Sequence, residues 1–126
     1  MLIPITCPVC GAAGAAPCDS CRAGLRRAPS LPRPDGVDSC RAVLDYDGVG
    51  RELVARLKYR NARAALPFLA AAMAALVDRD TVDAVTWAPT TARRRRQRGF
   101  DHAQLLARAV ARRMAVPCVA LLRRRP

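Results

Sequence analysis

Residues 84–122 have the sequence AVTWAPTTARRRRQRGFDHAQLLARAVARRMAVPCVALL, and this stretch decides the fold we expect. Residues 84–88 are short and β-prone and are followed by Pro89, which predicts a buried strand. Residues 101–114 repeat apolar side chains at helical spacing and begin with an Asp that suits an N-cap, so they predict a helix. Residues 117–122 predict a second short strand. A strand, a helix and a second strand are typical of a βαβ unit in a parallel sheet.

The sequence upstream of this unit predicts more elements of an α/β fold. Residues 39–46 place apolar side chains on one alternating face, as a strand does. Residues 50–59 and 62–77 carry apolar side chains at helical spacing, so each segment predicts a helix. We therefore expect residues 37–126 to form an α/β domain whose parallel sheet is incomplete, because few strands are present.

The first 36 residues are expected to form a small separate module, which contains four of the six cysteines. Two Cys-x-x-Cys turns, Cys7 to Cys10 and Cys18 to Cys21, are separated by seven residues. Each turn lets two thiolates converge on one ion, and four sulfur ligands suit a tetrahedral, structural Zn²⁺. The alternatives are a pair of redox-active dithiols or an iron site of rubredoxin type.

The surrounding sequence favours a metal site over disulfides. Residues 1–6 lack the pattern of a signal peptide, so we expect a cytoplasmic protein in a reducing environment. The proline-rich residues 29–36 predict a linker after the module. The longest uncharged run, residues 64–77, is short for a bilayer, so no membrane partner is expected. Cys40 and Cys118 are predicted to be small buried side chains.

The positive charge of the chain is concentrated in its last quarter. The net charge is +12, and residues 93–126 hold eleven arginines against Asp101 as their one acidic residue. Guanidinium groups bind phosphate bidentately, and a helix N-terminus favours anions. The arginine-rich loop expected before the helix at residue 101 therefore predicts a phosphate site, and the alternative is an arginine run that is only solvated.

Several motifs follow one another along residues 7–122. They are the paired Cys-x-x-Cys turns, Tyr46-Asp47-Gly48, a helix ending in Leu57-Lys58-Tyr59, a strand ending in Pro89, and Arg98-Gly99-Phe100-Asp101 at the start of a helix. This order resembles the ComF family, phosphoribosyltransferase-like proteins with an N-terminal zinc-ribbon module that are linked to bacterial DNA uptake. The resemblance implies a zinc ribbon and linker in residues 1–36, followed by the N-terminal part of a type I phosphoribosyltransferase-like (Rossmann-like) domain in residues 37–126.

The resemblance also implies ligands and the residues that hold them. Full-length relatives are expected to bind phosphoribosyl pyrophosphate or another phosphorylated ligand, and single-stranded DNA or DNA-processing proteins are further candidate partners. The positions expected to contact phosphate are Lys58, Thr90, Thr91, Arg93, Arg98 and Gly99. The expected zinc ligands are Cys7, Cys10, Cys18 and Cys21.

The sequence departs from the family at its catalytic end. It has neither the adjacent acidic pair nor the Thr-Thr-Gly loop that cradles the 5-phosphate of phosphoribosyl pyrophosphate. We therefore expect a truncated chain that does not catalyse phosphoribosyl transfer. The alternative function is a non-enzymatic, zinc-containing module that binds nucleic acid or a partner protein. His102 is expected to be exposed in the first helical turn. Trp87 is expected to lie in the core, and the alternative is that it stacks on a base. The alternative for Lys58 is an exposed position at a helix end.

Overall fold

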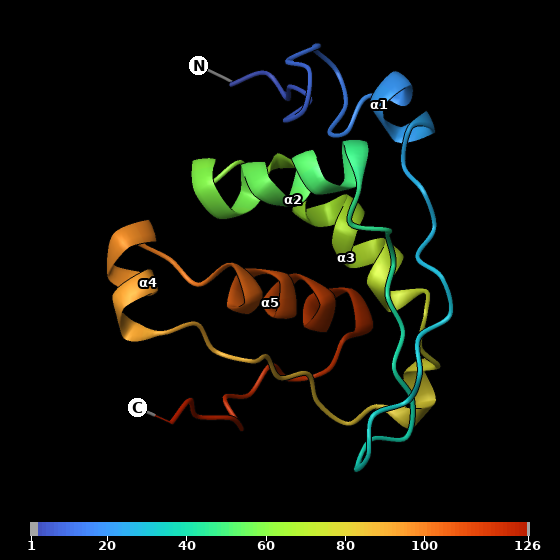
Figure 1. Ribbon diagram of the computed structural model, residues 1–126, viewed down its shortest axis with the longest axis vertical. Helices are drawn as coiled ribbons and strands as arrows, with labels where there is room; N and C mark the ends of the chain where they lie inside the picture. The colour runs from blue at the N-terminus through green and yellow to red at the C-terminus, as the bar shows by residue number, and fades with distance from the viewer. Residues whose placement is uncertain (1–2, 126) are drawn as a thin grey trace.

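The computed structural model describes residues 3–125, which form a largely helical molecule (Figure 1). Its α-helices are α1 (Asp19–Ala23), α2 (Gly48–Arg60), α3 (Leu66–Ala74), α4 (Ala92–Arg98) and α5 (His102–Met114). Two 3-10 turns, η1 (Arg63–Ala65) and η2 (Arg79–Thr81), lie on either side of α3. No helix in this described part of the chain is both long and apolar enough to cross a membrane.

Two apolar clusters hold the helices together, and α3 contributes to both. In the first cluster, Leu53 and Leu57 of α2 pack with Leu69 of α3, and the partly buried Leu106 of α5 lies against them. In the second, Ala70 of α3 packs with buried residues of α5, and Val85 lies against them. α3 is therefore packed between α2 and α5, and burial of these apolar faces is the main force that holds the body together.

The helices predicted at residues 50–59 and 101–114 are confirmed as α2 and α5. Asp101 caps α5 as expected, because its Oδ1 accepts hydrogen bonds from the amides of Ala103 and Gln104 at 3.1 and 3.4 Å. The helix predicted over residues 62–77 is shorter and comprises η1 and α3.

The predicted incomplete Rossmann-like parallel sheet is wrong. Among residues 3–125, strand pairing is limited to isolated bridges, of which the parallel one joins Val85 to Cys118. The Val85 amide donates to the Pro117 carbonyl at 2.8 Å, and the Val119 amide donates to the Val85 carbonyl at 2.9 Å. The two extended segments lie side by side below α5 (Figure 1). The pairing stops there because the Leu121 amide donates to the Thr86 hydroxyl at 3.2 Å, where a longer ladder would use a main-chain carbonyl.

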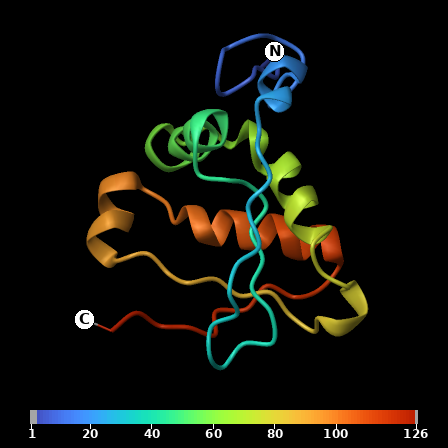
Figure 2. The same cartoon turned by 45° about the vertical axis from the view of Figure 1, so that its right-hand side comes forward.

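The third expected strand, residues 39–46, pairs elsewhere. Leu44 forms an antiparallel bridge with Arg27, and the Asp45 amide donates to the Arg26 carbonyl at 2.9 Å. Figure 2 shows this segment running beside the chain that leaves α1. Because its partner is a nearby segment of the chain, it adds nothing to the Val85 pair, and two strands alone make no stable sheet.

The predicted arginine-rich loop is also wrong, since these residues form α4. The Thr91 hydroxyl accepts a hydrogen bond from the Arg94 amide at 3.1 Å and caps the helix. Gly99 ends it with a φ of 78°, a left-handed conformation that glycine adopts readily. Arginine is a good helix former, so the run displays its side chains around a helix. Outside α4, Cys40, Trp87 and Cys118 are partly exposed, although burial was expected.

Candidate functional site

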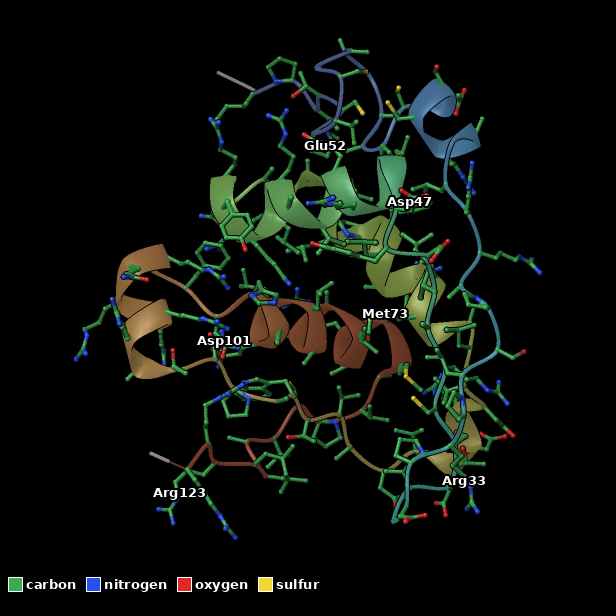
Figure 3. All side chains as sticks on the ribbon, viewed as in Figure 1. Arg33, Asp47, Glu52, Met73, Asp101 and Arg123 are labelled. Atoms are coloured by element: carbon green, nitrogen blue, oxygen red, sulfur yellow. The ribbon has the colours of Figure 1, made fainter. Side chains whose placement is uncertain are left out.

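The four predicted zinc ligands lie together and could hold one metal ion. The Sγ atoms of Cys7, Cys10, Cys18 and Cys21 are all within 4.8 Å of one another. The Cys10 and Cys18 sulfurs are 3.6 Å apart. Four thiolates at about 2.3 Å from a tetrahedral Zn²⁺ would have sulfurs about 3.8 Å apart, so the cluster fits such an ion. Figure 3 shows the sulfur atoms gathered between the N-terminal loop and α1.

Local backbone structure presents these thiols. In the first turn, the Gly11 amide donates to the Cys7 carbonyl, and the Cys7 amide donates to the Ala12 carbonyl, both at 2.8 Å. Gly11 has a φ of 80°, which favours glycine at the position after the second cysteine. In the second turn, Cys18 is the N-cap of α1 and Cys21 lies within the helix. A tight loop and one short helix therefore face each other across the cluster.

The thiols do not ionise independently. Burial raises the pKa of Cys7, but hydrogen bonds from the backbone of Cys10, Cys18 and Val9 outweigh it and bring the pKa to about 6. Burial and hydrogen bonds with the other three thiols raise the pKa of Cys21 to about 12. The four thiols thus share hydrogen bonds, and burial and these bonds favour the protonated form of Cys21. Because a metal ion binds thiolates, a bound cation would favour the deprotonated form of all four.

The residues around the cluster contact the helical body. Val9 packs against the first apolar cluster. The Arg22 guanidinium lies 5.3 Å from the centre of the Phe68 ring in α3. Gly24 approaches α2 so closely that a Cβ there would lie 2.8 Å from Cγ2 of Val49. The cysteine module, which we define as residues 5–24, therefore rests on α2 and α3, and the domain boundary at residue 36 stays a prediction.

A second candidate site is a cleft of about 890 Å³, which we call the basic cleft. It lies where the end of α2, the start of α5 and helix α4 meet. Lys58, Thr90 and Arg98, three of the predicted phosphate ligands, all line it. Thr91 lines an adjoining cleft instead. Arg93 and Gly99 are not among the lining residues of the basic cleft, and Gly99 serves to end α4.

The basic cleft is strongly cationic. Its positive side chains are Lys58, Arg60, Arg94, Arg98 and Arg124. Its one carboxylate belongs to Asp101, which is buried; Oδ2 accepts from the Thr90 amide at 3.1 Å, while Oδ1 caps α5. Figure 3 shows Asp101 where the chain passes from α4 to α5. Because Asp101 occupies the α5 amides, the expected anion site at this helix N-terminus is blocked, and side chains must supply the attraction.

An aromatic side chain borders the cationic ones. Tyr59 is 68% exposed, and the Arg98 guanidinium lies 5.1 Å from its ring centre. Arg124 Nε donates to the Pro89 carbonyl at 3.0 Å, which brings the C-terminal segment to the cleft. The motifs did not identify Tyr59, Arg60 or Arg124 as site residues. Tyr59 could have been found from its place beside Lys58, whereas Arg124 is brought to the site by a contact between residues far apart in sequence.

His102 is part of the cleft and is partly buried, although exposure was expected. Arg98 Nη1 lies 3.3 Å from His102 Nδ1, so the histidine accepts this hydrogen bond and carries its neutral-state proton on Nε2. Burial lowers the pKa of His102, and the charges of Lys58 and Arg98 lower it further, while Asp101 raises it. The imidazole is therefore neutral at pH 7.

No protein-family model, curated protein or solved structure matches this chain. The resemblance based on motif order has no independent support from these comparisons. The four-cysteine cluster and the basic cleft are therefore the features of this chain that bear on its function.

Proposed function

We propose that this chain is a cytoplasmic, zinc-containing protein that binds nucleotide-type phosphorylated ligands in the basic cleft, in the manner of a ComF-type protein linked to DNA uptake. One observation carries the proposal. Lys58 from α2, Thr90 from the segment before α4 and Arg98 from α4 converge on one cleft with three further arginines. The order of the sequence motifs supports the ComF-type role, with phosphoribosyl pyrophosphate or single-stranded DNA as the ligand.

The chemistry of the cleft favours phosphate over other anions. Guanidinium groups bind two phosphate oxygens at once, and the ammonium of Lys58 adds a mobile point charge. The Thr90 hydroxyl can donate a further hydrogen bond. The cleft volume of about 890 Å³ lies within the usual range for sites that enclose small organic ligands, and it is larger than inorganic phosphate requires. A nucleotide fits this cleft because it combines a phosphate group with an organic part of suitable size.

Binding without phosphoribosyl transfer is the activity we propose. The carboxylate of Asp101 in the cleft already accepts hydrogen bonds from the Thr90 amide and from the N-terminus of α5. Asp101 therefore has a structural role, and its two oxygens are not free to contact a ribose. The sequence also has no second acidic residue beside it to contact a ribose.

Zinc is the metal we propose for the four-cysteine cluster. The four soft sulfur donors leave no open position, so the ion would stabilise the module and take no part in catalysis. Ferric iron in the same ligands would give strong visible absorption, whereas Zn²⁺ is colourless. Elemental analysis with a visible spectrum therefore distinguishes the two metals.

Binding of a mononucleotide to the zinc-loaded protein tests the function of the cleft. Thymidine monophosphate should bind at low salt, with NMR shifts at residues 58–60 and 90–102. The double variant Lys58→Gln/Arg98→Gln should weaken binding by about tenfold or more for each side chain, since hydrogen bonds to charged groups contribute about 1.5–3 kcal/mol. Arg112→Gln/Arg113→Gln is the matched control, because it removes two exposed charges at the other end of α5.

The control variant should bind the mononucleotide about as well as the parent chain. Equal loss of affinity in both double variants would mean that general positive charge, and not the cleft, attracts the ligand. Absence of binding by any phosphorylated probe at low salt would reject the proposed function.

A further inference from the structure

A smaller basic cleft adjoins the first. It has a volume of about 530 Å³, and its cationic lining residues include Arg95, Arg123 and Arg125. Pro89, Thr90 and Arg124 line both clefts. The two cavities therefore adjoin each other at these shared residues.

Arg124 is placed at the junction by a specific contact. Its Nε donates to the Pro89 carbonyl at 3.0 Å, which ties the C-terminal segment to the segment that leads into α4. Three residues earlier in each segment, the hydrogen bond from the Leu121 amide to the Thr86 hydroxyl joins the same two segments. Since Nε makes the bond to Pro89, the two terminal nitrogens of the guanidinium are not used by it and can face a ligand at the junction.

A ligand that fills both clefts must be extended and must carry phosphates along its length. A mononucleotide can occupy one cleft at a time. A duplex is stiff and keeps its bases paired inside, so it cannot bend into two adjoining cavities and offer a base to one of them. A single strand is flexible, and its bases are free to stack.

Tyr59 supplies the surface on which a base could stack. Tyr59 is 68% exposed and lines the basic cleft. The guanidinium of Arg98, 5.1 Å from the ring centre, steadies the ring and adds positive charge beside it. Grooves that combine positive charge with exposed aromatic rings are typical of proteins that bind single strands without sequence preference.

We propose that the two clefts form one continuous track for single-stranded nucleic acid. One base stacks on Tyr59 in the basic cleft, Arg124 contacts a phosphate at the junction, and Arg95, Arg123 and Arg125 contact the following phosphates in the smaller cleft. This inference rests on the proposed binding of phosphate in the basic cleft and adds to it a second subsite and a base-stacking residue.

The length dependence of binding tests the track. Fluorescence anisotropy with labelled oligothymidylates of about two, four and eight nucleotides should show affinity rising with length, since a single-strand site spans several nucleotides. The salt dependence should steepen by about 0.7 in the log–log slope for each added phosphate contact. A duplex of equal phosphate number should bind more weakly than the single strand.

Variants separate the two clefts. Arg95→Ser/Arg123→Ser/Arg125→Ser should lower the affinity for the eight-nucleotide strand toward that for the dinucleotide, and should leave dinucleotide binding almost unchanged. A triple variant of Arg108→Ser/Arg112→Ser/Arg113→Ser on α5 is the control of equal charge. Inorganic polyphosphate is the probe that carries charge without bases.

Tyr59→Ala should weaken oligothymidylate binding by about five-fold to a hundred-fold, the usual effect of losing one stacked base, and should leave polyphosphate binding unchanged. Tyr59→Phe should restore strand binding. Equal affinity at all lengths, or equal effects of the two triple variants, would overturn the track while leaving mononucleotide binding in the basic cleft intact. If the parent chain does not bind a mononucleotide, the proposed function itself is overturned.

Discussion

The cysteine module and the helical body, residues 48–114, are stabilised by different means. Among the described residues of the module, one side chain belongs to the buried hydrophobic core, that of Cys7. The body buries ten such side chains, from Leu53 to Met114. A segment with so little core cannot offset the conformational entropy lost on folding. The module therefore depends on what its four thiols bind, while the body depends on the packing of α2, α3 and α5.

The contacts between these regions decide how far they can be separated. Val9 lies against the apolar cluster of α2 and α3, and Arg22 stacks over Phe68. Of these two module residues, Val9 is only partly buried and Arg22 is exposed. We therefore expect loss of metal to unfold the module and leave the body folded, while damage to the apolar cluster should lower the stability of the body and leave the metal site of the folded protein intact.

The largest expected effect is that of removing one metal ligand. Cys18→Ser should reduce the zinc content from about one ion per chain to nearly none, because structural zinc contributes on the order of 10 kcal/mol to the folding of small modules. Hydrogen exchange should then show loss of protection in residues 5–24 and retention in α5. Elemental analysis and exchange mass spectrometry measure the two effects.

Cys40→Ser is the matched control for this substitution, because Cys40 is also partly exposed but lies outside the cluster. It should retain both zinc and protection. Full zinc content in the Cys18→Ser protein would contradict the four-ligand site. Equal loss of protection in the module and in α5 would show that the two regions fold as one unit.

The next effect concerns the body. Leu53 is 1% exposed and belongs to the cluster that Val9 touches. Leu53→Ala should lower the free energy of unfolding by about 2–5 kcal/mol, through lost burial and the cavity left behind. Chemical denaturation of the zinc-loaded protein, followed by circular dichroism at helical wavelengths, measures this change.

Leu121→Ala is the control, since Leu121 is 67% exposed and should change stability by no more than about 0.5 kcal/mol. The zinc content of folded Leu53→Ala should equal that of the parent chain. If the two leucine substitutions cost the same, the apolar cluster is not what stabilises the body.

The same contrast explains what could be predicted from sequence. The thiol cluster depends on turns of four residues, so the spacing of Cys7, Cys10, Cys18 and Cys21 was sufficient to predict it. Helices α2 and α5 bury one face each, and their apolar periodicity predicted them. Asp101 was recognised as a cap because capping is also local.

The sequence-based predictions that were wrong or incomplete depend mostly on contacts between segments that are distant in the sequence. The parallel pair near Val85 and Cys118 ends after one bridge because the Thr86 hydroxyl takes the Leu121 amide, and no pattern in the sequence indicates that choice. α4 is exposed and has no apolar period, so its sequence predicts a loop instead of a helix. Lys58, Thr90 and Arg98 were predicted as ligands one by one, while their convergence with Arg124 depends on the fold.

A smaller effect is expected at Asp101, where stability and anion binding oppose each other. Asp101→Ala removes the cap of α5 and should cost about 0.5–2 kcal/mol in the free energy of unfolding. The same change removes the negative charge of the basic cleft and releases the amides of Ala103 and Gln104, so mononucleotide binding should tighten. Thermal unfolding and binding titrations measure the two effects.

Asp101→Asn separates the two contributions. Asparagine is a good N-cap, so stability should remain close to that of the parent chain, while the loss of charge should still tighten phosphate binding. Weaker phosphate binding by the alanine variant would indicate that Asp101 positions Thr90 for the ligand through the hydrogen bond between the Asp101 carboxylate and the Thr90 amide.

The smallest expected effect is a dependence of strand binding on pH through His102. Burial and the charges of Lys58 and Arg98 lower its pKa, and Asp101 opposes them. A phosphate bound between Lys58 and Arg98 would neutralise those charges and raise the pKa of His102, so the complex would bind a proton that the free protein does not. Affinity should therefore rise as the pH falls below neutrality, by up to about tenfold for each unit of difference between the two pKa values. Anisotropy with an oligothymidylate between about pH 5 and 8 measures this, because phosphodiesters do not titrate there. His102→Gln should flatten the dependence, and an unchanged slope in that variant would assign it to another group.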